Sequence, residues 1–116
     1  MPGIGSVSAQ DRRRLVYILD AIDLIEERTR SGREAFLADL GEQDAVLWRL
    51  YTLADAASQL SEQLQLRYLE IPWQQIRGFR NVAAHGYLDL VAELAWEIVE
   101  DHLPALRAAI EHELSG

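Results

Sequence analysis

The chain has 116 residues, of which 49% are hydrophobic, and its formal net charge is −8. This length suits one domain, residues 1–116, with a modest core, and the acidic balance argues against a protein that grips nucleic acid with its whole surface. The absence of cysteine excludes disulfide bonds and thiolate metal sites.

The first eight residues predict a flexible terminus. They lack the basic and apolar segments of a signal peptide, and no apolar stretch of the chain is long enough to span a bilayer. We therefore expect a cytoplasmic protein without a membrane partner.

The first helix is predicted to begin near Ser8, whose hydroxyl can cap it. One apolar stripe then follows the helical period. Its members are Leu15, Ile18, Leu19, Ile22 and Ile25. Four acidic residues lie off this stripe and should face water. They are Asp20, Asp23, Glu26 and Glu27.

Ser31-Gly-Arg-Glu34 matches a capping box, which predicts a short second helix that runs to about Leu40 and is ended by Gly41. The third helix should be the longest and fade after Arg67. Its apolar residues alternate spacings of four and three, as in bundle packing. They are Val46, Leu50, Leu53, Ala57, Leu60 and Leu64.

Pro72 suits the first turn of a fourth helix, which should end at Ala84 or His85 before Gly86. A fifth helix is predicted over residues 88–101, and Leu103-Pro104 begins a final helical segment or kinks the fifth. The fold class is therefore all-α, an antiparallel up-and-down bundle of four to six helices.

The histidines outside the fourth helix, His102 and His112, are expected to be solvent-exposed helix residues. No histidine of the chain follows a glutamate at the spacing of metal-binding bundles, so we predict no metal and no cofactor. All eleven basic residues are arginine. Arginine is the better bidentate phosphate ligand, although codon bias also explains a lack of lysine.

The end of the fourth helix gathers polar side chains. Arg77, Asn81 and His85 fall at i, i+4 and i+8, so they share one face, and Arg80 borders it. An imidazole can take a proton from a ribose 2′-OH or give one to a leaving oxygen, while arginine and asparagine can hold the scissile phosphate. The alternative is a structural helix whose arginines pair with carboxylates and which His85 caps.

The pattern Arg-Asn-x-x-x-His-x-Tyr, after a Pro-Trp-x-x-Ile helix start, resembles the HepT-like group of HEPN ribonucleases. The resemblance extends to the opening Arg-x-x-x-Ile-Leu-x-x-Ile segment and three later segments. These are Asp44-Ala45-Val46, Leu60-Ser61 and Leu103-Pro104-x-Leu106.

This resemblance implies a HEPN-like helical homodimer whose two motifs face each other across a cleft. It implies that Arg80 and His85 are the catalytic pair, with Asn81 as the polar residue beside the arginine. Tyr87 matches the tyrosine that a cognate nucleotidyltransferase antitoxin modifies with AMP. Such a modification would place bulk and negative charge beside the phosphate site and exclude RNA.

The chain departs from the family pattern at two places. Ala54-Asp55 stands where relatives often have Gly-Glu, and Val91 stands where they often have aspartate, although Asp89 is close in sequence. Asp55 on the apolar seam needs a partner if it is buried, and an arginine or histidine of the motif is the natural candidate. We therefore expect Asp55 and Arg77 to support the site.

The polar face of the fourth helix suits metal-independent cleavage of RNA, and the resemblance implies an endoribonuclease toxin of a type VII-like toxin–antitoxin system, acting on tRNA or mRNA. The alternative is a catalytically weak helical subunit that binds a nucleotidyltransferase. Metal-free RNA cleavage that depends on His85 would discriminate between the two.

Overall fold

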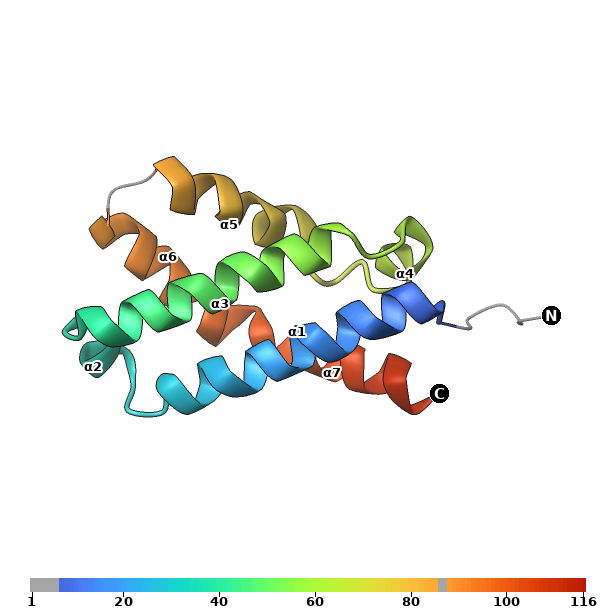
Figure 1. The fold of residues 1–116 in the computed structure, drawn as a ribbon, viewed down its shortest axis with the longest axis horizontal. Helices are drawn as coiled ribbons and strands as arrows, with labels where there is room; N and C mark the ends of the chain where they lie inside the picture. Colours follow the sequence, from blue (N-terminus) through green and yellow to red (C-terminus); the bar gives the residue numbers. More distant parts are fainter. Residues whose placement is uncertain (1–6, 86–87) are drawn as a thin grey trace.

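The computed structural model describes residues 7–85 and 88–116, which form seven helices and no strand. The helices build an elongated bundle of 51 × 27 × 21 Å (Figure 1). Helices α1 (Ala9–Arg28), α3 (Leu40–Ser58) and α5 (Trp73–His85) lie side by side and run in alternating directions, with α3 between the other two. The all-α prediction is confirmed, but the expected maximum of six helices is too low.

Helix α1 begins as its sequence predicts. The Ser8 hydroxyl accepts a hydrogen bond from the Asp11 backbone N–H at 3.0 Å, and the preceding Val7 packs against the core. The predicted apolar stripe faces inward, since Leu15, Ile18 and the two later isoleucines are no more than 1% exposed. The acidic residues off the stripe are exposed, as expected.

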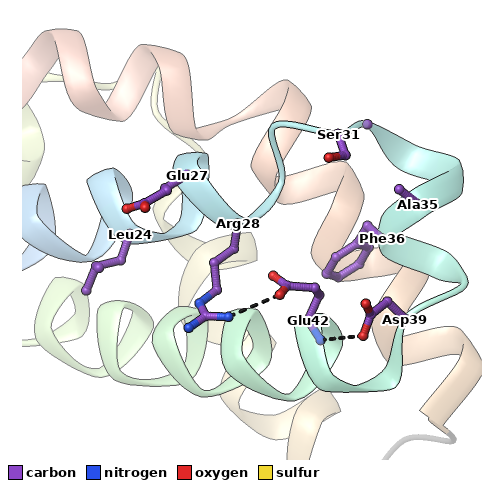
Figure 2. A pocket seen from close by; sticks show the side chains of 9 residues that line it. Leu24, Glu27, Arg28, Ser31, Ala35, Phe36, Asp39 and Glu42 are labelled. Carbon is purple, nitrogen blue, oxygen red and sulfur yellow. Dashed lines mark hydrogen bonds and ion pairs between the residues drawn. The ribbon is translucent and has the colours of Figure 1, made fainter.

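The second helix differs from its prediction at both ends. Helix α2 spans only Arg33–Leu37, and Gly32 precedes it with a φ of +96°, a left-handed conformation that favours glycine. Ser31 therefore does not cap the helix. Helix α3 already begins at Leu40 because the Asp39 carboxylate accepts from the Glu42 backbone N–H at 3.0 Å (Figure 2).

The predicted third helix is divided in two. Helix α3 ends at Ser58, and α4 covers Glu62–Arg67. Ser61 caps α4 by accepting from the Leu64 N–H, and it donates its own N–H and hydroxyl to Asp11 at 3.0 and 2.6 Å. The apolar seam nevertheless stays buried, because residues on both sides of the break are at most 4% exposed.

The last three helices follow their predictions closely. Helix α5 begins at Trp73, one residue after Pro72, and α6 spans Leu88–Asp101. Helix α7 (Leu103–Ser115) is a separate helix rather than a continuation of α6. His112 is exposed as expected, whereas His102 is partly buried at the start of α7.

A partly buried ion pair fixes α7 against α4. Arg67 makes two hydrogen bonds to the Glu113 carboxylate, at 2.8 and 3.1 Å, and the Tyr68 hydroxyl donates to the same carboxylate at 2.7 Å. The bond from Arg67 holds the pKa of Glu113 below its usual value. Burial, then the bond to Glu113, raises the pKa of Tyr68 to about 12.

None of the described helices combines the length and the apolar content needed to cross a membrane.

Candidate active site on helix α5

Helix α5 presents a polar side to solvent at the surface of the bundle. Its buried residues Trp73, Ile76 and Phe79 pack into the core, which leaves Asn81 and His85 exposed. His85 is the last residue of the helix, so its imidazole stands at the helix end.

Arg80 lies on the side of α5 that contacts α3. Its Nη1 is 3.2 Å from the Asp55 carboxylate and 3.5 Å from the Ser58 hydroxyl. Its Nε is buried and has no hydrogen-bond partner among the residues that the structure describes. The two side chains of the ion pair are 41% and 45% exposed, so this pair sits at the surface between α3 and α5.

Asp55 is thus half-exposed rather than buried on the apolar seam. Alanines flank it on the buried side, Ala54 and Ala57 being 1% exposed, while Asp55 projects toward Arg80. Among the possible partners that the sequence left open, the structure gives an arginine of the motif. One oxygen of the carboxylate accepts from Arg80 and the other from the Gln59 amide at 3.1 Å.

The arginine and the histidine of one chain do not converge. His85 lies five positions after Arg80, and at about 100° per residue their side chains leave the helix roughly 140° apart. Arg80 therefore does not simply border the face of Asn81 and His85, because it turns toward α3. Arg77 turns elsewhere again, and its Nη1 donates to Gln65 Oε1 at 3.4 Å.

Tyr87 and Val91 are the other two positions that the family resemblance singles out. Tyr87, the residue expected to accept AMP, lies outside the described residues. Val91 is 4% exposed and belongs to the core, so an aspartate there would be buried among apolar neighbours. In this chain the carboxylate beside the motif arginine is that of Asp55.

A hollow of about 610 Å³ lies away from α5, where α1 meets α2 and the start of α3 (Figure 2). Glu27, Asp39 and Glu42 line it, with Arg28 as its one cation, and Arg28 is already paired with Glu42 at 3.1 Å. Carboxylates repel a phosphate, so this hollow does not suit RNA.

A second hollow, of about 420 Å³, lies between α1 and α3 on the other side of Asp55 from Arg80. Arg13 and Arg14 line it together with Gln59 and Asp55. The Arg14 Nη2 donates to the Gln59 Oε1 at 3.2 Å, and the Gln59 amide donates to Asp55. A continuous polar chain therefore joins α1 to Arg80. This chain of contacts was not predicted from the sequence, although three consecutive arginines stand near its start.

The sequence was compared with family models, with curated proteins and with solved structures. The family model of the HepT-like ribonucleases matches residues 18–113, which include the whole of α5, and the chain belongs to this family. No solved structure matches the chain significantly.

Three similar proteins come from Methanocaldococcus jannaschii. One, named a γ-glutamylcyclotransferase and provisionally an RNase, is 32% identical over 83% of this chain, which spans only 44% of that protein. A second, provisionally named an RNase, is 25% identical over 90% of this chain and 98% of its own length. A third with the same kind of name is 29% identical over 82% of this chain and 80% of its own length.

Proposed function

We propose that this protein is a metal-independent endoribonuclease that cleaves RNA with Arg80 and His85. The observation that carries the proposal is the placement of the motif. The Arg80 guanidinium is held at the surface by Asp55 at 3.2 Å, and His85 is exposed on the same helix. Membership of a ribonuclease family supports the choice of RNA as substrate.

The residues suit cleavage by the ribose itself. His85 takes the proton from a 2′-OH, the 2′-oxygen attacks the adjacent phosphorus, and the bond from phosphorus to the 5′-oxygen breaks. An imidazolium then returns a proton to the departing 5′-oxygen. Arg80 stabilises the charge that grows on the phosphate oxygens, and Asn81 positions the same group. Asp55 holds the arginine, and Arg77 supports the helix beside it.

The divergence of Arg80 and His85 favours a homodimer. Side chains about 140° apart on one helix cannot both contact one phosphate easily, whereas two facing copies of α5 can supply them from opposite sides. The exposed surface of α3 offers apolar contacts for such a dimer, because Trp48 is 61% exposed and stacks on Tyr51 with 6.1 Å between ring centroids. Sedimentation as a single chain at working concentrations would contradict the dimer.

We further propose that the enzyme is the cytoplasmic toxin of a type VII-like toxin–antitoxin pair that acts on tRNA or mRNA. A nucleotidyltransferase antitoxin would transfer AMP to the Tyr87 hydroxyl. Tyr87 follows His85 by two residues, so the added phosphate would lie near the phosphate site and repel RNA. The resemblance of the motif to that of HepT-like toxins supports this assignment.

The proposal is tested by comparing an RNA with its fully 2′-O-methylated counterpart of the same sequence. Attack by the 2′-oxygen predicts that only the unmethylated RNA is cut, leaving a 5′-hydroxyl on the downstream fragment. Cleavage of both molecules at the same positions would show that water or another nucleophile attacks, and would overturn this mechanism.

A second candidate function is a catalytically weak subunit that binds a nucleotidyltransferase. Two observations favour it: Asp55 already neutralises Arg80, and Val91 replaces a frequent aspartate with a core residue. Retained binding to the nucleotidyltransferase without any cleavage of RNA by the unmodified chain would support this second function over the first.

A further inference from the structure

We propose that the hollow between α1 and α3 is a second phosphate-binding site, which holds the backbone of the RNA strand away from the cut. Arg13 and Arg14 would contact its phosphates. This inference rests on the proposed ribonuclease function, because it assigns a further part of the substrate to the same surface.

The hollow is connected to the candidate active site by a chain of polar contacts. Arg14, Gln59, Asp55 and Arg80 are joined in sequence by contacts of 3.2, 3.1 and 3.2 Å. Since these contacts link the two guanidiniums through one amide and one carboxylate, Arg14 and Arg80 lie closer together than the axes of α1 and α5, which flank α3. A short stretch of the RNA strand that leaves the motif therefore reaches the hollow.

The charges that line the hollow favour an anion. Asp55 is the one carboxylate that lines this hollow, and Arg80 neutralises it. Within residues 7–85 and 88–116, no carboxylate lies within ion-pair distance of Arg13 or Arg14, whereas Arg67 and several other arginines are paired. Arg13 and Arg14 therefore form a local positive surface on a chain whose net charge of −8 otherwise repels polyanions.

A further argument is the chemistry of the lining. Arg14 is oriented by Gln59 through a single N–H, so the rest of its guanidinium fork suits a phosphate. Tyr17 also lines the hollow and is 39% exposed, so its ring can stack on an unpaired base. Arginine together with an exposed aromatic ring is the usual composition of a surface that binds single strands.

The test is salt-dependent binding of a fluorescent oligouridylate to protein that carries His85→Ala, which prevents cleavage. The double variant Arg13→Ala/Arg14→Ala should bind more weakly at low salt. The slope of log affinity against log salt should fall in magnitude by about 0.7 to 1.4, the value for one or two lost phosphate contacts of a single strand.

Two control variants make the result specific. Arg30→Ala/Arg33→Ala removes the same charge near the other end of α1, where Arg33 makes only an exposed contact of 3.9 Å with Glu93, and it should keep the parent slope. Arg13→Lys/Arg14→Lys should retain most of the slope, because lysine keeps the charge.

An unchanged slope in the double alanine variant would overturn the second site while leaving the ribonuclease proposal, which is judged by cleavage with the parent protein. Loss of the dimer in that variant would also overturn it, because the hollow would then belong to a protein interface. If the parent protein neither binds nor cleaves RNA, the proposed function fails, and the inference fails with it.

Discussion

Arg80 shows how one side chain can be held in place and still reach a ligand. Its ion pair with Asp55 joins two half-exposed side chains, and an exposed pair of this kind contributes little to stability. The contact therefore serves to orient Arg80. A guanidinium that is already held against α3 loses little further rotamer freedom when it binds a phosphate.

Replacement of Arg80 by lysine should reduce the rate of RNA cleavage by roughly 10²–10³-fold, the effect of losing one oriented donor at a developing charge. Lysine keeps the charge but cannot reproduce the fork that contacts Asp55 and a phosphate together. Single-turnover cleavage measures the effect, with the exposed Arg30→Lys as the matched control. Equal rates for the two variants would remove Arg80 from the mechanism.

The ionisation of Glu113 affects the free energy of unfolding. Its pKa is lowered by Arg67, so its contribution to stability is present above the unfolded-state value and is lost as the pH falls through the lowered value. Glu113→Gln should therefore cost about 2 kcal/mol near pH 7 and progressively less in acid. Urea unfolding at pH 7 and at about pH 3 checks this, and a constant difference between the two proteins would contradict it.

The division of α3 from α4 depends on a contact between distant residues. Asp11 is 4% exposed and accepts both hydrogen bonds from Ser61, 50 positions along the chain. Asp11→Asn keeps the shape but turns one acceptor into a donor, and it should destabilise the fold by about 1–2 kcal/mol. Asp20→Asn, on the exposed side of α1, is the control and should change the free energy of unfolding by less than about 0.5 kcal/mol.

The contact between Asp11 and Ser61 also illustrates which helix boundaries can be predicted from the sequence and which cannot. The start of α1 and the bounds of α5 and α6 follow from local signals, since an N-cap, a proline and an apolar period lie within or beside the segments themselves. The start of α2 and the break after Ser58 do not, because Gly32 adopts a positive φ and Ser61 is bound by Asp11. Apolar spacing continued through the break, so it predicted burial correctly and helix continuity wrongly.

The same distinction applies to the candidate site. The motif on α5 and a partner role for Asp55 are readable from sequence and family resemblance, because both are carried by fixed spacings. The exposure of Asp55 and the bond between Arg14 and Gln59 are not, since they depend on how α1 and α3 pack.

At the scale of the molecule and its partners, Tyr87 is the proposed point of control. Tyr87→Phe removes the acceptor hydroxyl but leaves Arg80 and His85, so the variant should cleave RNA at a rate within about threefold of the parent and resist the nucleotidyltransferase. Intact mass after incubation with the antitoxin and ATP should show an added AMP on the parent alone. Addition of AMP to the variant would show that another residue is the acceptor.

The whole molecule is acidic, and its cationic groups near α5 and the start of α1 are few, so RNA affinity should be modest and strongly weakened by salt. RNA binding by such a protein depends on where its few cationic groups lie rather than on its total charge. Its activity should therefore be lost when one group of the motif is removed, even though the fold is unchanged.

The decisive measurement for metal-independent cleavage by His85 is RNA cleavage in excess chelator by the parent protein and by His85→Ala, with helix content and dimer mass recorded for both. We expect cleavage by the parent and a loss of at least about 10²-fold in the folded variant. Equal cleavage by both proteins, or no cleavage by a parent whose intact mass shows an unmodified chain, would contradict it.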